Sequence, residues 1–273
     1  MDTAPVLVTG ATGSVGRRVA AQLRGLGAPV RAASRRGPTP FDWTDEATWE
    51  PALDGVRGAF LLAPDGVGLN PRFVAQAVDS KVRHLVLLSS RAIEVIHDER
   101  LLAAERAVRD SGAEWTVVRS DWFDQNFDEG AFRAAVLGGE LAVPVGSCKQ
   151  TFVDLDDVAA VCAAVLTAPE EHAGRTYEVT GPRALSFAEA CATITRASGR
   201  PVTFHGEEDA YLAQQAEIGR SPQDAAEDLA AFAALRALGD AEPQDTVVRV
   251  AGRPARPFEE YAAAAAAAGS WTG

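Results

Sequence analysis

The sequence predicts an α/β fold in which a doubly wound parallel sheet carries a small C-terminal α+β cap. In the first half of the 273 residues, short apolar runs alternate with segments of helical periodicity, which is the pattern of βαβ units. A glycine-rich turn stands between the first apolar run and the first helical segment. After about residue 140 the alternation changes to helices mixed with short strands, and this part is expected to cover the carboxyl ends of the sheet.

The first half supplies most of the predicted sheet. Strands are expected where apolar residues run together, at residues 6–9, 30–33, 58–63, 84–89 and 114–119. Helices are expected at residues 15–26, 70–80 and 100–111, with a turn and short helix at 42–53. Connections between successive parallel strands should be right-handed crossovers.

The second half mixes helices with two short strands. Ser186 and Glu189 form the sequence pattern of a capping box and begin a helix that runs to residue 198. Further helices are expected at residues 156–167, 214–238 and 259–268, and strands at 176–180 and 201–205. We therefore divide the chain into a first domain at residues 1–145, which contains the glycine-rich turn, and the expected cap region at 146–273, partly interleaved with the first.

Composition and charge exclude several classes of function. The net charge is −12, so the chain is expected neither to bind nucleic acid nor to associate with anionic membranes. No apolar run is long enough to span a bilayer, and the N-terminus lacks the basic start of a signal peptide, which predicts a cytoplasmic protein. The three cysteines and four histidines show no metal-ligand spacing, so no metal site is expected and the cysteines are interpreted as buried apolar residues.

The glycine-rich turn predicts a Rossmann-type dinucleotide site. Gly10 allows a tight turn, Gly13 lets the backbone approach a pyrophosphate, and Gly16 allows the helix to pack closely on the strand. The N–H groups and the dipole of the helix would then hold the phosphates. The alternative is a glycine-rich turn without a ligand. The candidate cofactor-binding residues of this turn are Gly10, Ala11, Thr12, Gly13, Ser14, Val15 and Gly16.

The end of the second strand favours NADP(H) over NAD(H). Sites specific for NAD place a carboxylate here, on the ribose 2′-hydroxyl. This chain instead has Ser34, Arg35 and Arg36, and guanidinium groups pair well with the oxygens of a 2′-phosphate. The alternative is a solvated basic turn.

Several motifs carry a family resemblance over nearly the whole chain. They are TGATGSVG at 9–16, SRR at 34–36, the passage from Glu105 to Asn126, FVDLDDVA at 152–159 and YEVTGPRALSFAEA at 177–190. With these motifs the chain resembles the NmrA-like atypical short-chain dehydrogenases/reductases, and most of all the type 2 NAD(P)H:quinone oxidoreductases. The resemblance implies a Rossmann domain, a small cap, a cleft between them and NADP(H) as ligand. It leaves open whether the chain reduces an acceptor or only senses the cofactor.

The usual catalytic pair of short-chain dehydrogenases is missing. Neither Lys81 nor Lys149 has a tyrosine four residues before it, so the Tyr-x-x-x-Lys motif is absent. Alignment on Glu105 places His97 at the tyrosine position, where it is a candidate proton donor. Ser90 is a second catalytic candidate, which could hydrogen-bond a carbonyl. The alternative for His97 is an exposed loop residue.

The remaining candidates surround the expected cleft. Trp122, Phe123 and Asn126 are candidate substrate contacts, with a core or structural role as the alternative. Arg119 ends a strand beside the cleft, with an ion pair to Asp121 or Asp124 as its structural alternative. The remaining candidates for cofactor contacts are Asp42, which could instead cap a helix, and Leu62, Ala63, Pro64 and Ser89.

Two functions remain from these observations. The first is an NADPH-dependent reductase of a quinone-like or conjugated carbonyl molecule, in which catalysis consists mostly of positioning the hydride donor. The second is a non-catalytic NADP(H)-binding sensor or regulator. A chain that has kept the fold but lost the ligand is disfavoured by the intact glycines. The assembly could be a monomer or a homodimer.

Overall fold

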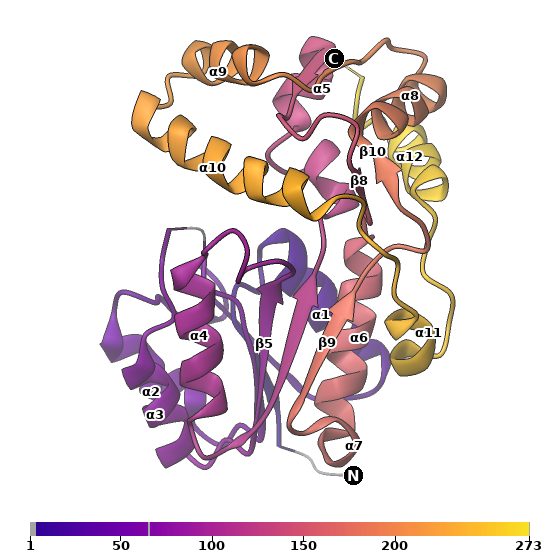
Figure 1. Ribbon diagram of the computed structural model, residues 1–273. Coiled ribbons are helices and arrows are strands. Elements are labelled where there is room, and N and C mark those ends of the chain that lie inside the picture. The colour runs from indigo at the N-terminus through magenta and orange to yellow at the C-terminus, as the bar shows by residue number, and fades with distance from the viewer. Residues whose placement is uncertain (1–3, 65, 273) are drawn as a thin grey trace.

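Seven strands form one parallel sheet in the computed structural model, which describes residues 4–64 and 66–272 (Figure 1). The order of the strands is β3-β2-β1-β4-β5-β6-β9, and every neighbouring pair is parallel. Their bounds are β1 Val6–Val8, β2 Val30–Ser34, β3 Thr39–Pro40, β4 Gly58–Leu61, β5 His84–Ser90, β6 Glu114–Ser120 and β9 Arg175–Val179. The predicted α/β fold with a parallel sheet is confirmed.

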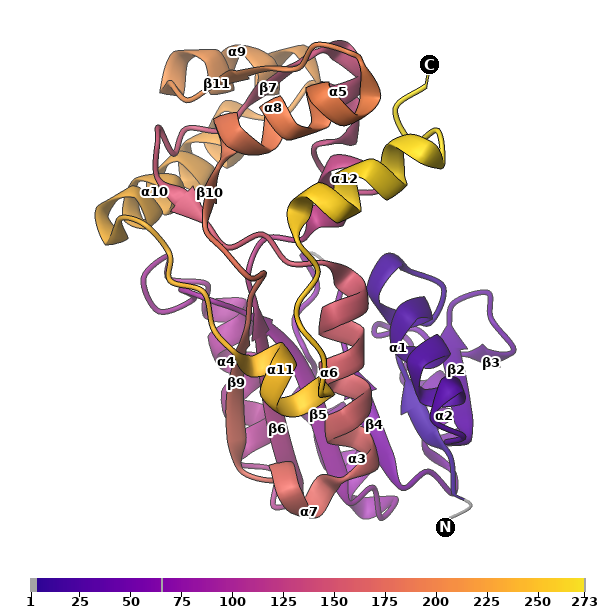
Figure 2. The same cartoon turned by 90° about the vertical axis from the view of Figure 1, so that its right-hand side faces the viewer.

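Helices cover both faces of this sheet (Figure 2). One face packs against α1 (Ser14–Gly25) and α6 (Leu155–Thr167), with α11 (Thr246–Ala251) beside α6. The opposite face packs against α2 (Trp49–Leu53), α3 (Pro71–Asp79) and α4 (Glu99–Arg109). The short helices η1 (Glu46–Thr48), η2 (Asp124–Phe127) and α7 (Pro169–His172) lie in the connections.

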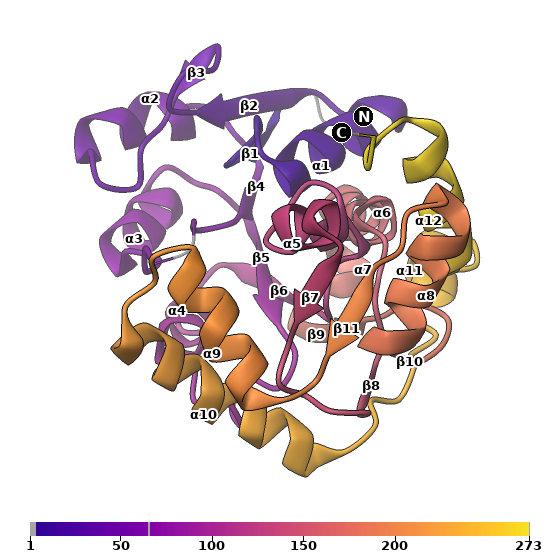
Figure 3. The ribbon, with the colours of Figure 1, turned by 90° about the horizontal axis from the view of Figure 1, so that it is seen from above.

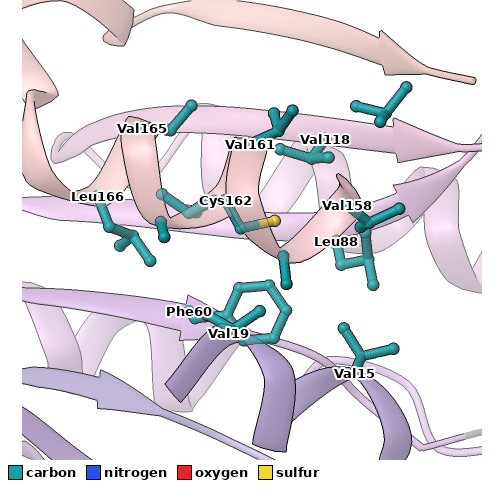
Figure 4. Close-up of a cluster of buried hydrophobic side chains, with 14 of the residues drawn as sticks. Val15, Val19, Phe60, Leu88, Val118, Val158, Val161, Cys162, Val165 and Leu166 are labelled. Atoms are coloured by element: carbon teal, nitrogen blue, oxygen red, sulfur yellow. The ribbon is translucent and has the colours of Figure 1, made fainter. Parts of the chain in front are cut away.

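The core between α1, α6 and the sheet is built mostly from aliphatic side chains, together with Phe60 and Cys162 (Figure 4). Val19 from α1, Phe60 from β4 and Cys162 from α6 are fully buried in it. Because the central strands are buried on both faces, their sequences are continuous apolar runs, and this is why the pattern predicted them. Cys191 is buried as well. Cys148 is only half-buried, so the prediction that all three cysteines are buried is wrong for this one.

The cap lies above the carboxyl edge of the sheet (Figures 1 and 3). Two two-stranded sheets, β10 with β8 and β11 with β7, support its helices. Aromatic rings such as Phe152 and Phe187, 4.9 Å apart and edge-to-face, fill its own core. Its elements are α5 Arg133–Gly138, β7 Glu140–Ala142, β8 Lys149–Gln150, β10 Leu185–Ser186, α8 Phe187–Ser198, β11 Thr203–His205, α9 Glu208–Glu217, α10 Pro222–Leu238 and α12 Phe258–Ala267.

The prediction of one helix over residues 214–238 is wrong. The segment contains the end of α9 and then α10, because Gly219 adopts a left-handed φ of +76° and ends the first helix. Ser221 caps the next helix by accepting a hydrogen bond from the Asp224 N–H, and Pro222 occupies its first position. The capping box of Ser186 and Glu189 is confirmed, with both hydrogen bonds formed.

The division of the chain at residues 145 and 146 stays a prediction. Both α6 and β9 come from the second half of the chain, yet they belong to the sheet layer. Within the described residues, no helix is both long and apolar enough to cross a membrane. The residues that argued against a signal peptide include Met1 to Thr3, which lie outside the described part of the chain.

His84 is a buried imidazole at the start of β5, at the sheet edge opposite the cap. It is 2% exposed, and its Nε2 lies 2.9 Å from the Thr116 hydroxyl, which donates its own hydrogen to the His172 carbonyl. The imidazole must therefore donate through Nε2, which leaves Nδ1 buried without a partner among the residues that the structure describes. Burial, with a smaller effect of His172, lowers the pKa of His84 to about 4.

This depressed pKa predicts a loss of stability in acid. The unfolded chain binds a proton at His84 below pH 6.5, but the folded chain binds it only near pH 4. The stabilisation is therefore complete above pH 6.5 and is lost as the pH falls toward 4, by at most about 3 kcal/mol. We expect His84→Gln to flatten this decline in urea unfolding at pH 7, 5.5 and 4.5. An equally steep decline in the variant would contradict the assignment.

Candidate cofactor and acceptor site

The glycine turn between β1 and α1 has the geometry of an anion-binding turn. Gly10 has a φ of +63°, and its carbonyl accepts a hydrogen bond of 2.9 Å from the Gly13 N–H. A Cβ on Gly16 would lie 2.2 Å from the Gly10 carbonyl oxygen, so only glycine fits there. Gly13 is the N-cap residue of α1 and has no side chain. The first N–H groups of this helix therefore donate no hydrogen bond to a capping side chain.

The end of β2 presents a hydroxyl and two cations close to this turn. Ala11 donates its N–H to the Ala33 carbonyl, which joins the turn to β2. The Ser34 Oγ is buried and has no hydrogen-bond partner within the described residues, whereas Arg35 and Arg36 are exposed. A buried hydroxyl without a partner is unusual in a folded protein, and a ligand oxygen would satisfy it. The residues present therefore fit a phosphorylated ribose.

The other candidate cofactor residues lie at the neighbouring strand ends. Asp42 accepts hydrogen bonds from the Thr44 N–H and hydroxyl, which lower the pKa of its carboxyl. It therefore closes a local turn, and the cap of the following short helix is Asp45. Leu62 and Ala63 line a cavity described below, and Pro64 beside them is exposed.

A cavity of about 740 Å³ lies at the carboxyl ends of the central strands, and residues of α10 line one side of it. This is the position at which ligands bind in open α/β sheets. Trp122, Phe123 and Asn126, the three candidate substrate residues, all line it. Ser89 and Ser90 at the end of β5 line it as well.

Aromatic side chains form one wall of the cavity, which we call the aromatic wall. The Trp122 ring stacks on Phe132 at 5.7 Å and lies parallel to Phe232 of α10, with ring centroids 6.3 Å apart and planes 9° apart. Both Trp122 and Phe232 line the cavity. The wall suits a flat conjugated molecule, because aromatic pairs prefer parallel-offset or edge-on contacts.

A buried ionic network supports the floor of the cavity. Glu105 is 3% exposed and accepts two hydrogen bonds from Arg119, at 2.8 and 2.7 Å. Arg119 also contacts Glu94 at 2.6 Å, and Arg109 adds a third cation–carboxylate contact at 2.9 Å. The alternative of an ion pair between Arg119 and Asp121 or Asp124 is therefore wrong, because Arg119 at the end of β6 pairs with Glu94 and with Glu105 on α4. The Ser89 hydroxyl donates to Glu105 at 2.7 Å, so it is engaged by the protein itself.

The structure separates the two catalytic candidates. Ser90 lines the cavity, and its hydroxyl makes a long hydrogen bond of 3.3 Å to the Arg91 carbonyl. His97 is exposed, has a left-handed φ of +53° and does not line the cavity. No tyrosine, histidine, cysteine or lysine is found among the described residues of the cavity wall.

Two features of the site were missed by the sequence analysis. Arg91 contacts Asp121 at 3.0 Å and Glu178 at 3.1 Å, which joins the ends of β5, β6 and β9. Glu129, which follows the cavity residues Phe123 and Asn126, binds the guanidiniums of Arg17 and Arg18 on α1. No sequence spacing signals such pairs, because their members lie far apart in the chain.

Comparison with known proteins gives a family for this chain. A family described as NAD(P)H-binding matches residues 10–169. The (4-alkanoyl-5-oxo-2,5-dihydrofuran-3-yl)methyl phosphate reductase of Streptomyces griseus is 37% identical, over 94% of this chain and 96% of its own. The NAD(P)H azoreductase of Xenophilus azovorans is 34% identical, over 96% and 98% of the two chains.

A solved structure agrees with this family. The NADPH-dependent quinone oxidoreductase of Escherichia coli superimposes with a TM-score of 0.77 at 25% identity, over 95% of this chain and 98% of its own. The family match begins in the glycine turn that the sequence analysis singled out. The chain therefore belongs to the NAD(P)H-binding, NmrA-like atypical short-chain dehydrogenases/reductases and is an NAD(P)H-dependent oxidoreductase.

Proposed function

We propose that this protein is an NADPH-dependent reductase of flat conjugated acceptors, either quinone-like molecules or conjugated carbonyl compounds. The observation that carries the proposal is the aromatic cavity at the carboxyl ends of β5 and β6, beside the glycine turn. The relatives named above reduce an unsaturated lactone and azo compounds, as their names state, and both kinds of molecule are conjugated. When bound, the cofactor would supply the hydride.

The residues of the chain would bind and orient the two reactants. The N–H groups from Gly10 to Gly16 would hold the pyrophosphate, and Ser34, Arg35 and Arg36 the phosphorylated ribose. Leu62 to Pro64, Ser89 and Asp42 would flank the rest of the cofactor. Holding a donor and an acceptor in contact accounts for a large part of such a rate enhancement.

The acceptor would lie against the aromatic wall. Trp122 and Phe123 would contact its ring, and Asn126 and Ser90 would offer hydrogen bonds to a carbonyl oxygen. His97 stands outside the cavity wall, so its role as a proton donor stays a prediction that requires movement of its loop. A reduced quinone is stable enough as an anion to take its proton from water.

The first test combines binding with turnover. Thermal melts with NADPH, NADH or neither should show the largest upward shift with NADPH. The same samples should then lose absorbance at 340 nm when menadione or a conjugated ketone is added. A shift without turnover would favour the alternative, a cofactor sensor. No shift with either cofactor would contradict the role of the glycine turn.

The two arginines after β2 should set the preference for NADPH. Loss of one charge-assisted contact to a phosphate costs about 1.5–3 kcal/mol, which corresponds to roughly 10- to 100-fold in affinity. We expect Arg35→Ala/Arg36→Ala to raise the Kd for NADPH by at least about tenfold and to leave that for NADH within about twofold. Arg24→Ala/Arg83→Ala, which removes the same charge from two exposed arginines outside the turn after β2, is the control for net charge. Equal losses for both cofactors would assign the arginines a merely structural role.

A further inference from the structure

The wall of the acceptor cavity carries a surplus of negative charge. Among its described residues there are six carboxylates and three guanidiniums, and one of the carboxylates, Asp228, is also paired with Arg220 from outside the wall, so two carboxylates remain in excess. Charge lining a cleft raises the local concentration of ligands of opposite sign. The carboxylates are Glu94, Asp121, Glu178, Asp228, Asp240 and Glu242, and the cations are Arg91, Arg100 and Arg119.

All three guanidiniums already have carboxylate partners. Arg91 is held by Asp121 and Glu178, and Arg119 by Glu94 and Glu105. Arg100 contacts Asp98 at 3.5 Å. An anionic group on the acceptor would therefore have to displace one of these pairs before it met a free cation.

Two carboxylates of the wall, in the loop after α10, form no ion pair with any cation of the described residues. The Asp240 carboxylate accepts a hydrogen bond of 2.8 Å from the Lys149 backbone N–H, a neutral donor that leaves its charge in place. The Glu242 side chain is exposed and has no hydrogen bond or ion pair within the described part of the chain. Leu238 and Gly239, at the carboxyl end of α10, line the same side of the cavity, so the helix dipole adds further negative potential there.

Aromatic side chains line the same cavity as these carboxylates. Trp122 and Phe232 both belong to its wall, and the Trp122 ring stacks on Phe132 as well as on Phe232. The faces of aromatic rings attract cations, by about 0.5–2 kcal/mol according to how far the pair is desolvated. Rings and carboxylates therefore favour the same class of ligand, a flat molecule that carries positive charge.

The wall also lacks an obvious proton donor. Reduction of a neutral carbonyl leaves an oxyanion that must be protonated, and no tyrosine, histidine, cysteine or lysine is among the described wall residues. A cationic carbon acceptor needs no proton. It would take the hydride, form one C–H bond and become neutral. The C4–H bond of the dihydronicotinamide would break, and the oxidised nicotinamide ring would then carry the positive charge.

We infer that the preferred acceptor is a conjugated cation, such as an iminium or a delocalised aryl-substituted carbocation. This inference rests on the proposed reductase function and narrows its substrate class. Reduction would cancel the charge that attracts the acceptor, so the neutral product would bind more weakly than the substrate.

Binding of unreactive probes tests the charge preference without turnover. The probes are 2-naphthyltrimethylammonium and 2-naphthalenesulfonate, which share a ring system and differ in charge. Their Kd values are measured by calorimetry on the protein saturated with NADP⁺. We expect the cation to bind at least about tenfold more tightly than the anion, and the difference to shrink as salt rises from 20 to 300 mM. Equal binding, or tighter binding of the anion, would overturn the inference.

Variants locate the preference in the loop after α10. Asp240→Asn/Glu242→Gln should weaken binding of the cation by about five- to tenfold and leave the anion unchanged or tighter. Glu50→Gln/Glu114→Gln removes the same charge from exposed positions outside the cavity wall and should change neither value. A preference that survives the first double variant, or that falls equally in the second, would overturn the assignment to Asp240 and Glu242.

Turnover separates the inference from the function on which it rests. NADPH oxidation is measured with menadione and with a cationic triarylmethane dye. A lower KM for the dye, lost in Asp240→Asn/Glu242→Gln, supports the inference. Reduction of menadione with no advantage for the dye overturns the inference and leaves the reductase intact. Oxidation with neither acceptor, despite tight cofactor binding, overturns the proposed function and the reductive step together.

Discussion

Gly16→Ala is expected to abolish high-affinity NADPH binding. The new methyl carbon would lie 2.2 Å from the Gly10 carbonyl oxygen and 2.6 Å from its carbon, and both are backbone atoms that cannot rotate away. The turn would have to open, which costs about 1–3 kcal/mol in stability and misplaces the N–H groups that face the phosphates. We expect a Kd at least about 100-fold higher by fluorescence titration.

Gly25→Ala is the matched control, because it makes the same change in the same helix. A Cβ on Gly25 would meet nothing within 4 Å, and its φ is not left-handed. This variant should bind NADPH as the parent does and should be slightly more stable, by up to about 1 kcal/mol, since alanine is the better helix former. If Gly16→Ala bound the cofactor as tightly as Gly25→Ala, the assignment of the turn would be wrong.

Arg119→Met is expected to lower the free energy of unfolding by about 3–5 kcal/mol, because it leaves a buried carboxylate without its main partner. Glu105 is 3% exposed and accepts two hydrogen bonds from Arg119, whereas its other cation, Arg109, is 38% exposed and makes a single contact. Burial of an unpaired charge costs more than the loss of an exposed ion pair. Urea unfolding at pH 7 measures the change.

A double variant separates the buried charge from the lost packing. Glu105→Gln/Arg119→Met removes the charge as well as its partner, so it should be more stable than Arg119→Met alone. The surface substitution Arg106→Met, which removes a pair between two exposed side chains, should change stability by no more than about 1 kcal/mol. A loss below about 1 kcal/mol in Arg119→Met would show that the network contributes little to stability.

The sheet and the cofactor turn could be predicted because their signals are local. Strands such as β5 are buried on both faces and read as unbroken apolar runs, and the glycines at 10, 13 and 16 follow from backbone geometry alone. The break between α9 and α10 was also signalled, by Gly219 and by Ser221 before Pro222, but the helical periodicity on either side outweighed it.

The acceptor cavity could be predicted only in part. Trp122, Phe123 and Asn126 were found because they belong to the passage that carries the family resemblance, and they line a cavity that forms where parallel strands end. The position of Phe232 over Trp122 depends on how the cap folds back, which no local pattern encodes. The partner of Arg119 was missed for the same reason, because the choice among nearby carboxylates is made by tertiary packing.

We expect the roof of the cavity, helix α10, to open more readily than the sheet beneath it. Ala225 alone is buried among the 17 residues of α10, although this helix supplies Asp228, Ala231, Phe232, Leu235 and Leu238 to the cavity wall. Local opening costs least free energy where few buried apolar side chains lose their packing contacts. Amide hydrogens of α10 should therefore exchange with solvent far faster than those of β5. In the proposed reductase, lifting of this one helix would let acceptors enter and products leave while the sheet stays closed, and the rate of that lifting would then set an upper limit on turnover.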